Sequence, residues 1–523
     1  MAKHDVVVIG AGHNGLVVGA YLAKAGMDVC VVERADYAGG AVNTKEITVP
    51  GFKHDCCGTG HFVIQYNPLI VHDELKLMSK FGLKYIYPEA PVANIYPDDT
   101  NIMLYADLDK TCQSIAKFSE KDAEVYRQYI KNCKQIIDML IPGMFSPPVP
   151  LGPFFAQLDA SPLGQSLLNS FFMSAWDVID DMFEHDKTKL FMAKMITEPL
   201  VGPEEKGTGM NLFISLPILH YYPVGLPEGG SGELSNSLVR CLESHGGQVR
   251  LNSEVKKITI KSGRATGVVL ASGEEIEARK AIVANLDPRI VFPQMISDVE
   301  PDFLHKVQGI KNPSFSVLIS HFALNEAPKF KAGDEVLNGH SIEPLPWLED
   351  FRRGYDSLRY GEIPTSIQPL VCVQSYHDPT RAPKGKHVMY LSHYVPWNLK
   401  DGGPEKWDEI KEKVADFILD EMQKYTTNMN SENIILRKVH SPMDYVRMNP
   451  NLYNASIDGP GVFLNQMFSH RPIAELGQLR GPFEGLYWSG HAFHPAGAIS
   501  GAGRNTVQMI MADLDMEFDD VIA

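Results

Sequence analysis

The chain has 523 residues, too long for one hydrophobic core, so two or more domains are expected. Hydrophobic residues make up 44% and charged residues 21%, which is typical of a folded globular protein and argues against a disordered one. The formal net charge of −16 argues against a nucleic-acid partner. Seven cysteines without a CxxC motif indicate reduced thiols, and no signal peptide or membrane-length apolar run is found, so we expect a cytoplasmic protein without an integral membrane segment.

The first elements in the chain are a strand, a glycine turn, a helix and a second strand. Residues 6–9 form an apolar run that predicts a buried strand, and residues 14–26 have the apolar spacing of an amphipathic helix. Residues 29–32 predict a second buried strand, which ends at Glu33. A glycine-rich turn alone is a weak signal, but all these parts in register are typical of a dinucleotide-binding unit in an α/β fold.

The glycines and the acidic residue of this unit each have a physical role. Gly10 allows the tight turn, Gly12 lets the backbone approach a pyrophosphate, and Gly15 lets the helix pack closely on the strand. The helix N-terminus offers free N–H groups and a positive dipole end to that pyrophosphate. Glu33 can accept hydrogen bonds from a ribose diol, and its charge disfavours the 2′-phosphate of NADP.

The middle of the chain divides into a helical part and a return to the α/β pattern. Residues 46–70 read as loops and residues 71–224 as mainly helical, with a proline-rich break at 142–153. The glycine-rich residues 225–232 mark a change of pattern. After them we predict a helix over 232–245 and strands over 248–251, 255–261, 265–270 and 281–284.

The last part of the chain is mixed and ends in a strand and a helix. Residues 316–324 and 387–394 predict strands, and 406–425 predict an amphipathic helix. A final strand at 486–489 leads through a glycine- and alanine-rich turn into a helix at 501–515. We therefore predict a Rossmann-type domain assembled from discontinuous segments and a mixed, helix-rich substrate domain: residues 1–70, 225–300 and 475–523 for the first, and 71–224 and 301–474 for the second.

Four sequence blocks, in order, resemble the phytoene desaturase and carotenoid isomerase-like branch of the FAD-dependent amine oxidase superfamily. They are residues 7–40, 227–258, 378–387 and 449–505, which together span nearly the whole chain. Within this branch the chain looks most like the phytoene dehydrogenase-related oxidoreductases. The resemblance implies that FAD, and not NAD, binds at the N-terminal motif.

The resemblance also implies which residues bind FAD. Glu33 would bind the AMP ribose with Arg34 beside it, and Gly490 would lie near the pyrophosphate or ribityl chain. The last helix would begin at the pyrimidine end of the flavin, where N–H groups stabilise the negative charge of the reduced ring. Carried over by position, the full set is Gly10, Gly12, Asn14, Gly15, Glu33, Arg34, Gly40, Ala41, Val255, Gly490, Ala498 and Ile499.

Two segments depart from the family pattern. The usual His-Pro-Gly-Gly-Gly-Val is His-Pro-Ala-Gly-Ala-Ile at residues 494–499, and residues 453–458 lack an expected glycine. Both changes concern the substrate more than the cofactor. Candidate catalytic residues near the flavin-facing segments are His494, His61 and Tyr222. A structural role is an open alternative for all three, and no histidine or cysteine spacing predicts a metal site.

The sequence thus predicts an FAD-dependent oxidoreductase that transfers a hydride from a C–C or C–N bond of an apolar or alicyclic small molecule to flavin N5. Reoxidation would need oxygen, a quinone or a protein carrier, because no second dinucleotide motif is found. Two alternatives stay open: a redox-neutral polyene isomerase that uses reduced FAD, and a flavin-binding interaction protein without turnover. The sequence leaves open whether the protein forms a homo-oligomer.

Overall fold

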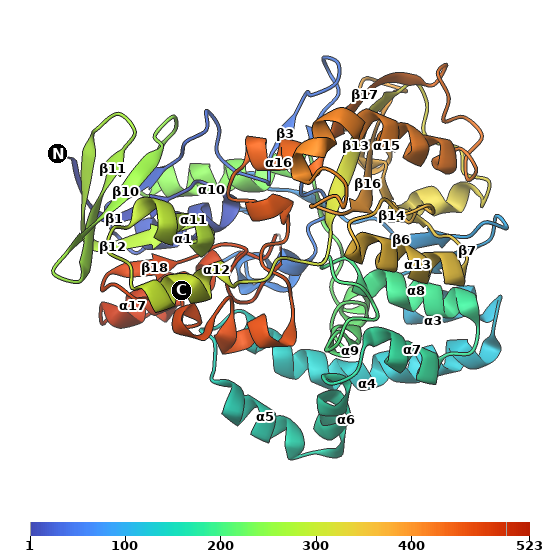
Figure 1. Cartoon of the computed structure of the whole chain (residues 1–523), viewed down its shortest axis with the longest axis horizontal. Helices are drawn as coiled ribbons and strands as arrows, with labels where there is room; N and C mark the ends of the chain where they lie inside the picture. The colour runs from blue at the N-terminus through green and yellow to red at the C-terminus, as the bar shows by residue number, and fades with distance from the viewer. Residues whose placement is uncertain (1, 498, 523) are drawn as a thin grey trace.

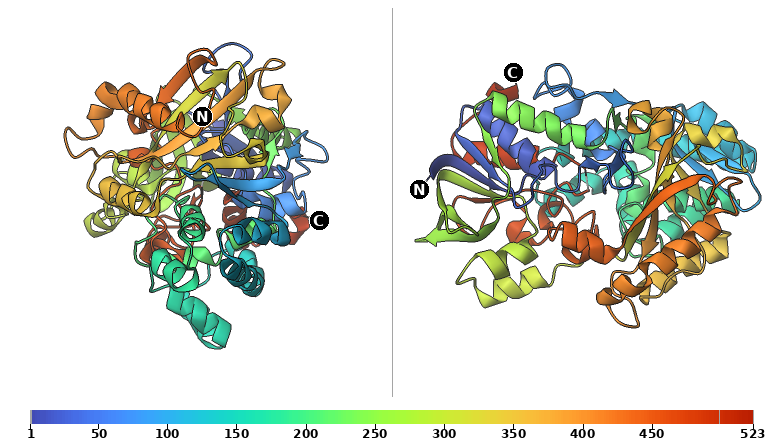
Figure 2. Two further views of the ribbon diagram at one scale, coloured as in Figure 1. Left: turned by 90° about the vertical axis from the view of Figure 1, so that its right-hand side faces the viewer. Right: turned by 90° about the horizontal axis from the view of Figure 1, so that it is seen from above.

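The computed structural model describes residues 2–497 and 499–522, and it shows two lobes, each built around a seven-stranded sheet (Figures 1 and 2). The first sheet has the order β10-β11-β12-β1-β2-β9, with β18 paired to β12. Its strands are β1 (Ala2–Ile9), β2 (Val29–Val32), β9 (Gln248–Arg250), β10 (Val255–Lys261), β11 (Arg264–Leu270), β12 (Glu275–Ala284) and β18 (Leu486–Trp488).

The core of this sheet is parallel because β1 pairs in parallel with both β2 and β12. The apolar end of β1 is buried on both faces, as the continuous apolar run predicts for a parallel strand. Val6 and Val8 share a core with α1 (His13–Lys24), α10 (Gly232–Ser244) and α17 (Gly503–Asp513) on one face. Val7 and Ile9 share a core with α11 (Pro288–Met295) on the other face. This helix-covered parallel sheet confirms the predicted Rossmann-type α/β fold.

The described residues also form α-helices in both lobes. They are α1 (His13–Lys24), α2 (Pro68–Val71), α3 (Leu108–Ala116), α4 (Glu120–Met144), α5 (Leu151–Asp159), α6 (Pro162–Ser170), α7 (Ala175–Met182), α8 (Asp186–Ile196), α9 (Gly209–Leu212), α10 (Gly232–Ser244), α11 (Pro288–Met295), α12 (Pro301–Gln308), α13 (Leu348–Arg359), α14 (Gln374–His377), α15 (Trp407–Met422), α16 (Pro442–Met448), α17 (Gly503–Asp513) and α18 (Asp519–Ile522). In the part of the chain that the structure describes, no helix combines the length and the apolar character needed to cross a membrane.

The second sheet has the order β17-β13-β16-β15-β14-β6-β7 and forms the other lobe (Figure 2). Its strands are β6 (Ala90–Ile95), β7 (Asn101–Leu104), β13 (Ser316–Leu324), β14 (Gly339–Pro344), β15 (Leu370–Cys372), β16 (His387–Val395) and β17 (Ile434–His440). The predicted strands at 316–324 and 387–394 are therefore present and pair with each other. Four short strands, β3 (Thr44–Lys45), β4 (His54–Asp55), β5 (Tyr85–Ile86) and β8 (Leu226–Pro227), form two small ladders beside the sheets.

The prediction that residues 71–224 are mainly helical missed one hairpin. Strands β6 and β7 lie in this stretch and form an edge of the second sheet. They are short and fully buried, so their sequences show neither the alternation of a half-buried strand nor a helical period. Helices follow from residue 108 onward, and in Figure 1 α5 and α6 project away from the rest of the molecule.

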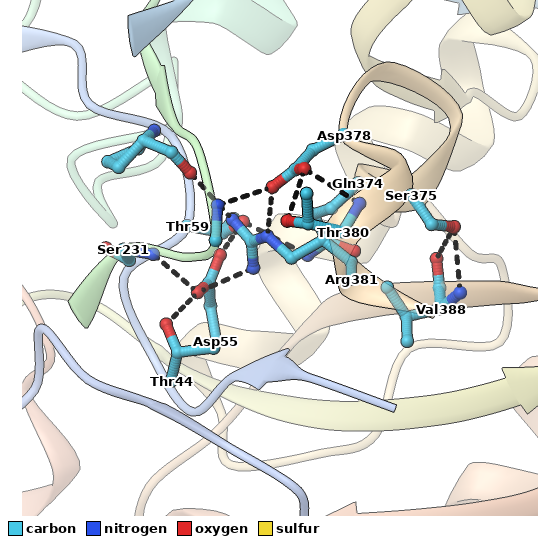
Figure 3. A network of polar contacts seen from close by, with 12 residues as sticks. Thr44, Asp55, Thr59, Ser231, Gln374, Ser375, Asp378, Thr380, Arg381 and Val388 are labelled. Atoms are coloured by element: carbon cyan, nitrogen blue, oxygen red, sulfur yellow. Dashed lines mark hydrogen bonds and ion pairs between the residues drawn. The ribbon is translucent and has the colours of Figure 1, made fainter. Parts of the chain in front are cut away.

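The two lobes are joined by a buried network around Arg381 (Figure 3). The guanidinium donates to Asp55 at 2.9 Å and to Asp378 at 3.0 Å, and all three side chains are at most 1% exposed. Asp378 also accepts a hydrogen bond from the backbone N–H of Gly229, and Asp55 accepts one from that of Ser231, both at 2.8 Å. The network thus connects strand β4, the crossing at 227–231 and the second lobe, next to the cavity described below.

Candidate active site

A cavity of about 420 Å³ is lined by residues of both lobes. Its lining includes the glycine turn after β1 and the loops that carry Gly40 and Gly490. It also includes residues of α8, of the second sheet and of the loop that carries Asp458. The dinucleotide motif and the second lobe therefore share a single continuous space.

The glycine turn is built as the sequence predicts. Gly10 has a φ of +95°, a conformation that few other residues adopt without strain. A Cβ atom on Gly15 would lie 2.2 Å from the carbonyl oxygen of Gly10, so only glycine lets α1 pack this closely. The Asn285 side chain, which follows β12, donates to that same carbonyl at 3.1 Å and braces the turn. The first turn of α1 thus begins at the cavity with its backbone N–H groups free for an anion.

The Glu33 carboxylate lies at the end of β2, close to the glycine turn. It accepts hydrogen bonds from the backbone N–H groups of Ala11 and Ala35, both at 2.8 Å. Each carboxylate oxygen has a further lone pair, so the group can still accept from a ribose diol. The Arg34 side chain is exposed beside it, and Val255 begins β10 only two residues after Ser253, whose N–H donates to Glu33 O at 2.7 Å.

Further predicted cofactor residues meet at the cavity from distant parts of the chain. Gly40, Ala41, Gly490 and Ile499 all line it, as do Gly12 and Asn14. Gly490 has a φ of +111°, and a Cβ there would lie 2.8 Å from the Asn285 amide oxygen. The predicted position Ala498 lies outside the described residues.

Several buried polar atoms near the turn have no partner among the described residues. They are His13 Nε2, Asn14 Oδ1, Asn43 Oδ1, Ser489 Oγ and His491 Nε2. Burial lowers the pKa of His13 to about 3 and that of His491 to about 4, so both rings are neutral at pH 7. Unpartnered buried polar groups are uncommon in proteins. His13, Asn14 and His491 line the cavity, so a polar dinucleotide beside Gly12 would reach them and the residues present fit FAD.

His61, predicted as a catalytic candidate, lies behind the cavity wall. It is fully buried, and its Nδ1 and Nε2 form hydrogen bonds with Tyr85 Oη at 2.9 Å and Ser231 Oγ at 2.8 Å. Burial lowers its pKa well below the usual value. Both ring nitrogens are occupied by the protein, and the ring is not among the groups that line the cavity.

His494 and Tyr222 also lie outside the lining of the cavity. His494 Nε2 forms a hydrogen bond with the carbonyl of Gly143 at 2.9 Å, which ties the C-terminal loop to the end of α4. Burial lowers the pKa of His494 to about 4. The Tyr222 ring packs on Tyr66, which does line the cavity, with 5.6 Å between ring centroids. The catalytic roles of His61, His494 and Tyr222 stay predictions, and these positions are those of supporting residues.

Three carboxylates that line the cavity were not predicted as site residues: Glu198, Glu343 and Asp458. Burial, and then the nearby charge of Glu198, raises the pKa of Asp458 to about 7. Burial also raises the pKa of Glu343. The one sequence signal toward them was the unusual segment 453–458, whose last residue is Asp458.

Comparisons with known proteins agree with this geometry. Residues 8–72 match the model for an NAD(P)-binding Rossmann-like domain, and residues 171–504 match that for flavin containing amine oxidoreductases. The second match covers more than half of the chain, so it establishes the family.

Two curated relatives and one solved structure cover almost the full length. A limonene dehydrogenase subunit from Castellaniella defragrans is 28% identical, with 99% of this chain and 97% of that protein covered. The phytoene desaturase (neurosporene-forming) of Rhodobacter capsulatus is 24% identical, with 96% and 93% covered. The structure of an oxidoreductase from Methanosarcina mazei superposes with a TM-score of 0.61 at 18% identity and covers 98% of this chain and all of that one. The chain therefore belongs to the flavin-containing amine oxidoreductases, in their phytoene desaturase-like branch, and is an FAD-dependent oxidoreductase.

Proposed function

We propose that the protein oxidises an apolar or alicyclic small molecule by removing a hydride from a C–C or C–N bond. The observation that carries this proposal is the single cavity that joins the dinucleotide motif to the second lobe. Bound FAD supplies the hydride acceptor at N5. Apolar side chains such as Val92, Leu219 and Val317 line this cavity and favour a largely apolar ligand.

The roles of the protein residues follow from their positions. Gly10, Gly12 and Gly15 would give the pyrophosphate access to the start of α1, and Glu33 would accept hydrogen bonds from the ribose. The apolar cavity walls would hold the reacting carbon in place. We propose the remaining cofactor contacts at the predicted positions that line the cavity or lie beside Glu33.

Anaerobic mixing with a substrate tests this proposal. Because one relative belongs to a limonene dehydrogenase, limonene is the first compound to try, followed by other alicyclic hydrocarbons and amines. A substrate should bleach the absorbance of oxidised flavin without any added reductant. Turnover only after chemical reduction of the flavin would instead indicate the isomerase. If no compound bleaches the flavin and none is turned over after reduction, the protein binds flavin without turnover.

The electron acceptor is tested by following the same flavin absorbance. We propose oxygen, a quinone or a protein carrier, because the chain has one dinucleotide motif and no second one for a nicotinamide. Rapid mixing of the reduced enzyme with air-saturated buffer or with a water-soluble quinone separates the first two. A reduced flavin that is stable to both would favour a carrier protein.

A further inference from the structure

Removal of a hydride from a C–C or C–N unit leaves a proton to be removed from the neighbouring atom. A group that takes this proton must reach the substrate, have a free lone pair and hold the proton near pH 7. His61, His494 and Tyr222 lie outside the lining of the cavity and do not reach it. The titratable residues that do line the cavity are His13, Cys57, Tyr66, Glu198, His340, Glu343, Tyr390, Tyr394, Asp458 and His491.

The histidines, the thiol and the tyrosines of this set are unsuited to the task. Burial lowers the pKa of His13 and His340 to about 3 and that of His491 to about 4, so none of these rings holds a proton at pH 7. Burial raises the pKa of the Cys57 thiol to about 12 and raises those of the three tyrosines as well. These four groups therefore carry their own protons at pH 7 and cannot accept another.

Two of the three carboxylates are already engaged by the protein. Glu343 accepts hydrogen bonds from two side chains at 2.8 and 3.1 Å. Glu198 forms an ion pair with Lys194 and accepts a hydrogen bond from Tyr394 Oη at 2.9 Å. Asp458 is the third carboxylate, and its side chain accepts no hydrogen bond from the described residues. Its lone pairs are therefore free on the side that faces the cavity.

The backbone next to Asp458 touches a segment that carries a predicted cofactor residue. A Cβ atom on Gly459 would lie 2.6 Å from the carbonyl oxygen of His491. His491 directly follows Gly490, which lines the cavity and is a predicted flavin contact. The loop that carries Asp458 is thus packed against the loop of Gly490.

A second predicted flavin segment lies close to the Asp458 side chain. After burial, the nearby charge of Asp458 is what raises the pKa of the Cys57 thiol. The next residue, Gly58, donates its N–H to the carbonyl of Ala41 at 3.1 Å, and a Cβ on it would lie 2.8 Å from Ile499 Cδ1. Ala41 and Ile499 are both predicted cofactor residues. Asp458 therefore lies beside the segments that are expected to hold the flavin.

The loop that carries Asp458 is held in one conformation. Ala455 has a φ of +55°, a left-handed conformation that few residues other than glycine adopt without strain. Ser316 Oγ donates to the carbonyl of Ala455 at 2.8 Å, and Arg471 donates to that of Pro460 at 2.9 Å. Strained backbone that is fixed by its surroundings is common where a reactive side chain is positioned. The carboxylate is thus presented to the cavity from a rigid support.

The charges around Asp458 adjust how firmly it holds a proton. Burial and then the charge of Glu198 raise its pKa to about 7, and the charge of Arg471 limits this rise. The Arg471 guanidinium donates to main-chain carbonyls, among them that of His491 at 3.1 Å, and not to Asp458. Near pH 7 the ionised and protonated forms of Asp458 are therefore both populated. A group in this state can accept a proton and later release it.

We propose that Asp458 accepts the proton that leaves the substrate when the hydride is removed. One atom of the substrate loses hydrogen as a hydride, which carries two electrons to the flavin. The bond to hydrogen on the neighbouring atom breaks, its proton passes to the Asp458 carboxylate, and its electron pair forms the new double bond. Asp458 releases the proton before the next turnover. This inference rests on the proposed function, because it names the group that completes that oxidation.

Infrared spectra of the FAD-loaded enzyme test the protonation of Asp458 without any substrate. A protonated-carboxyl band should titrate near pH 7. The band should shift on labelling with carbon-13 aspartate and should be absent from Asp458→Asn. A wild-type enzyme without such a band would overturn the inference.

Photoreduction of the flavin tests whether Asp458 lies beside it. The reduced flavin gains negative charge, which raises the pKa of a neighbouring carboxylate. In weakly buffered solution with a pH indicator, the wild-type enzyme at pH 8 should therefore take up more protons than Asp458→Asn. Equal proton uptake by the two proteins would place Asp458 away from the flavin and overturn the inference.

Anaerobic rapid mixing tests the catalytic role, with limonene first and then the other compounds of the substrate screen. Asp458→Asn keeps the shape but should slow flavin bleaching roughly 100-fold or more, with the FAD content and melting temperature unchanged. The wild-type rate should fall roughly tenfold between pH 8 and pH 6, because the ionised form of Asp458 is lost, and the variant should lack this dependence. The exposed Asp159→Asn is the matched control and should keep the wild-type rate and pH profile.

Added formate separates a catalytic role of Asp458 from a structural one. In Asp458→Ala, formate brings a carboxylate to the emptied position and should restore part of the lost rate. A variant that is slow only because its cavity is distorted would not respond to formate. A slow variant that keeps the wild-type pH profile and gains nothing from formate would therefore overturn the inference.

The inference and the proposed function fail in different ways. If a compound bleaches the flavin equally fast in the wild-type enzyme and in Asp458→Asn, oxidation stands and this inference falls. If no compound bleaches the flavin although Asp458 titrates and takes up a proton on photoreduction, the proposed oxidation falls. The assignment of Asp458 as the group that holds a proton beside the flavin then stands.

Discussion

Replacement of Arg381 by methionine tests the junction between the two lobes. Met keeps most of the volume but removes the guanidinium from Asp55 and Asp378, both of which are almost fully buried (Figure 3). Removing one partner of a buried ion pair typically destabilises a protein by about 3–5 kcal/mol, since it leaves an uncompensated charge. With an unfolding entropy of about 2 cal/mol/K per residue, a chain of this length that unfolds as one unit would lose about 4 °C in melting temperature.

The pH dependence of this loss has a definite sign. Burial alone would raise the pKa of Asp378, but hydrogen bonds from Thr380 and Gly229 and the charge of Arg381 lower it. In the wild-type protein its stabilising contribution is therefore complete above the ordinary Asp value and is lost only as the pH falls through the lowered pKa. Without Arg381 the pKa of Asp378 rises. In the variant, Asp378 therefore takes up its proton at a higher pH, which removes the uncompensated charge. The loss of melting temperature relative to the wild-type protein should thus be smaller at pH 5 than at pH 7.5.

Differential scanning calorimetry at pH 5 and pH 7.5 measures this loss of melting temperature. Arg353→Met is the control, because Arg353 forms an exposed ion pair with Glu349. Exposed pairs contribute about 0–1 kcal/mol, so this control should lower the melting temperature by less than about 1 °C. The reasoning about the buried network would be refuted if Arg381→Met lowered the melting temperature no more than the control does. It would also be refuted if the loss of melting temperature grew as the pH falls.

Three further predictions concern the cofactor site and its surroundings. Gly15→Ala places a Cβ 2.2 Å from the carbonyl oxygen of Gly10, so the purified variant should contain at most a tenth of the wild-type flavin by absorbance; full occupancy would argue against the packing role. Glu33→Gln removes the charge but not the shape, and FAD affinity measured by fluorescence quenching should fall roughly tenfold, with the exposed Glu46→Gln as an unchanged control. Because burial lowers the pKa of His494 to about 4, unfolding is coupled to proton uptake, so stability should fall as the pH drops from about 6.5 to 4. In His494→Gln that loss should be smaller and flavin reduction should persist; abolished reduction with an intact fold would instead make His494 catalytic.

Elements with a clear local pattern could be predicted from the sequence. Residues 255–261 form β10 as expected, and the helix predicted over 232–245 is α10 at Gly232–Ser244. The residues of the dinucleotide motif could also be predicted from the sequence, because Gly10, Gly12, Gly15 and Glu33 follow one another within a single βαβ unit. Within such a unit, the spacing of these residues along the chain determines how they lie relative to one another.

The rest of the site depends on contacts between distant segments. Asn285 braces the glycine turn from the end of β12, far away in sequence, and no local pattern marks it. Glu198 and Asp458 come from different loops and both line the cavity. In the sequence, neither differs from an ordinary surface carboxylate, because only the folded structure brings them to the cavity. The edge hairpin of β6 and β7 was missed for a related reason, since short buried strands carry no distinctive period.

A crystal structure of the FAD-loaded enzyme tests the central claim most directly, namely that one cavity holds both the flavin and the substrate. The account predicts the ADP half of FAD at the glycine turn and Glu33, and the flavin ring against Gly40 and Gly490. Its free face should open into the cavity that Glu198 and Asp458 line. A flavin ring placed elsewhere, or one whose reactive face is covered by protein and separated from these carboxylates, would contradict it.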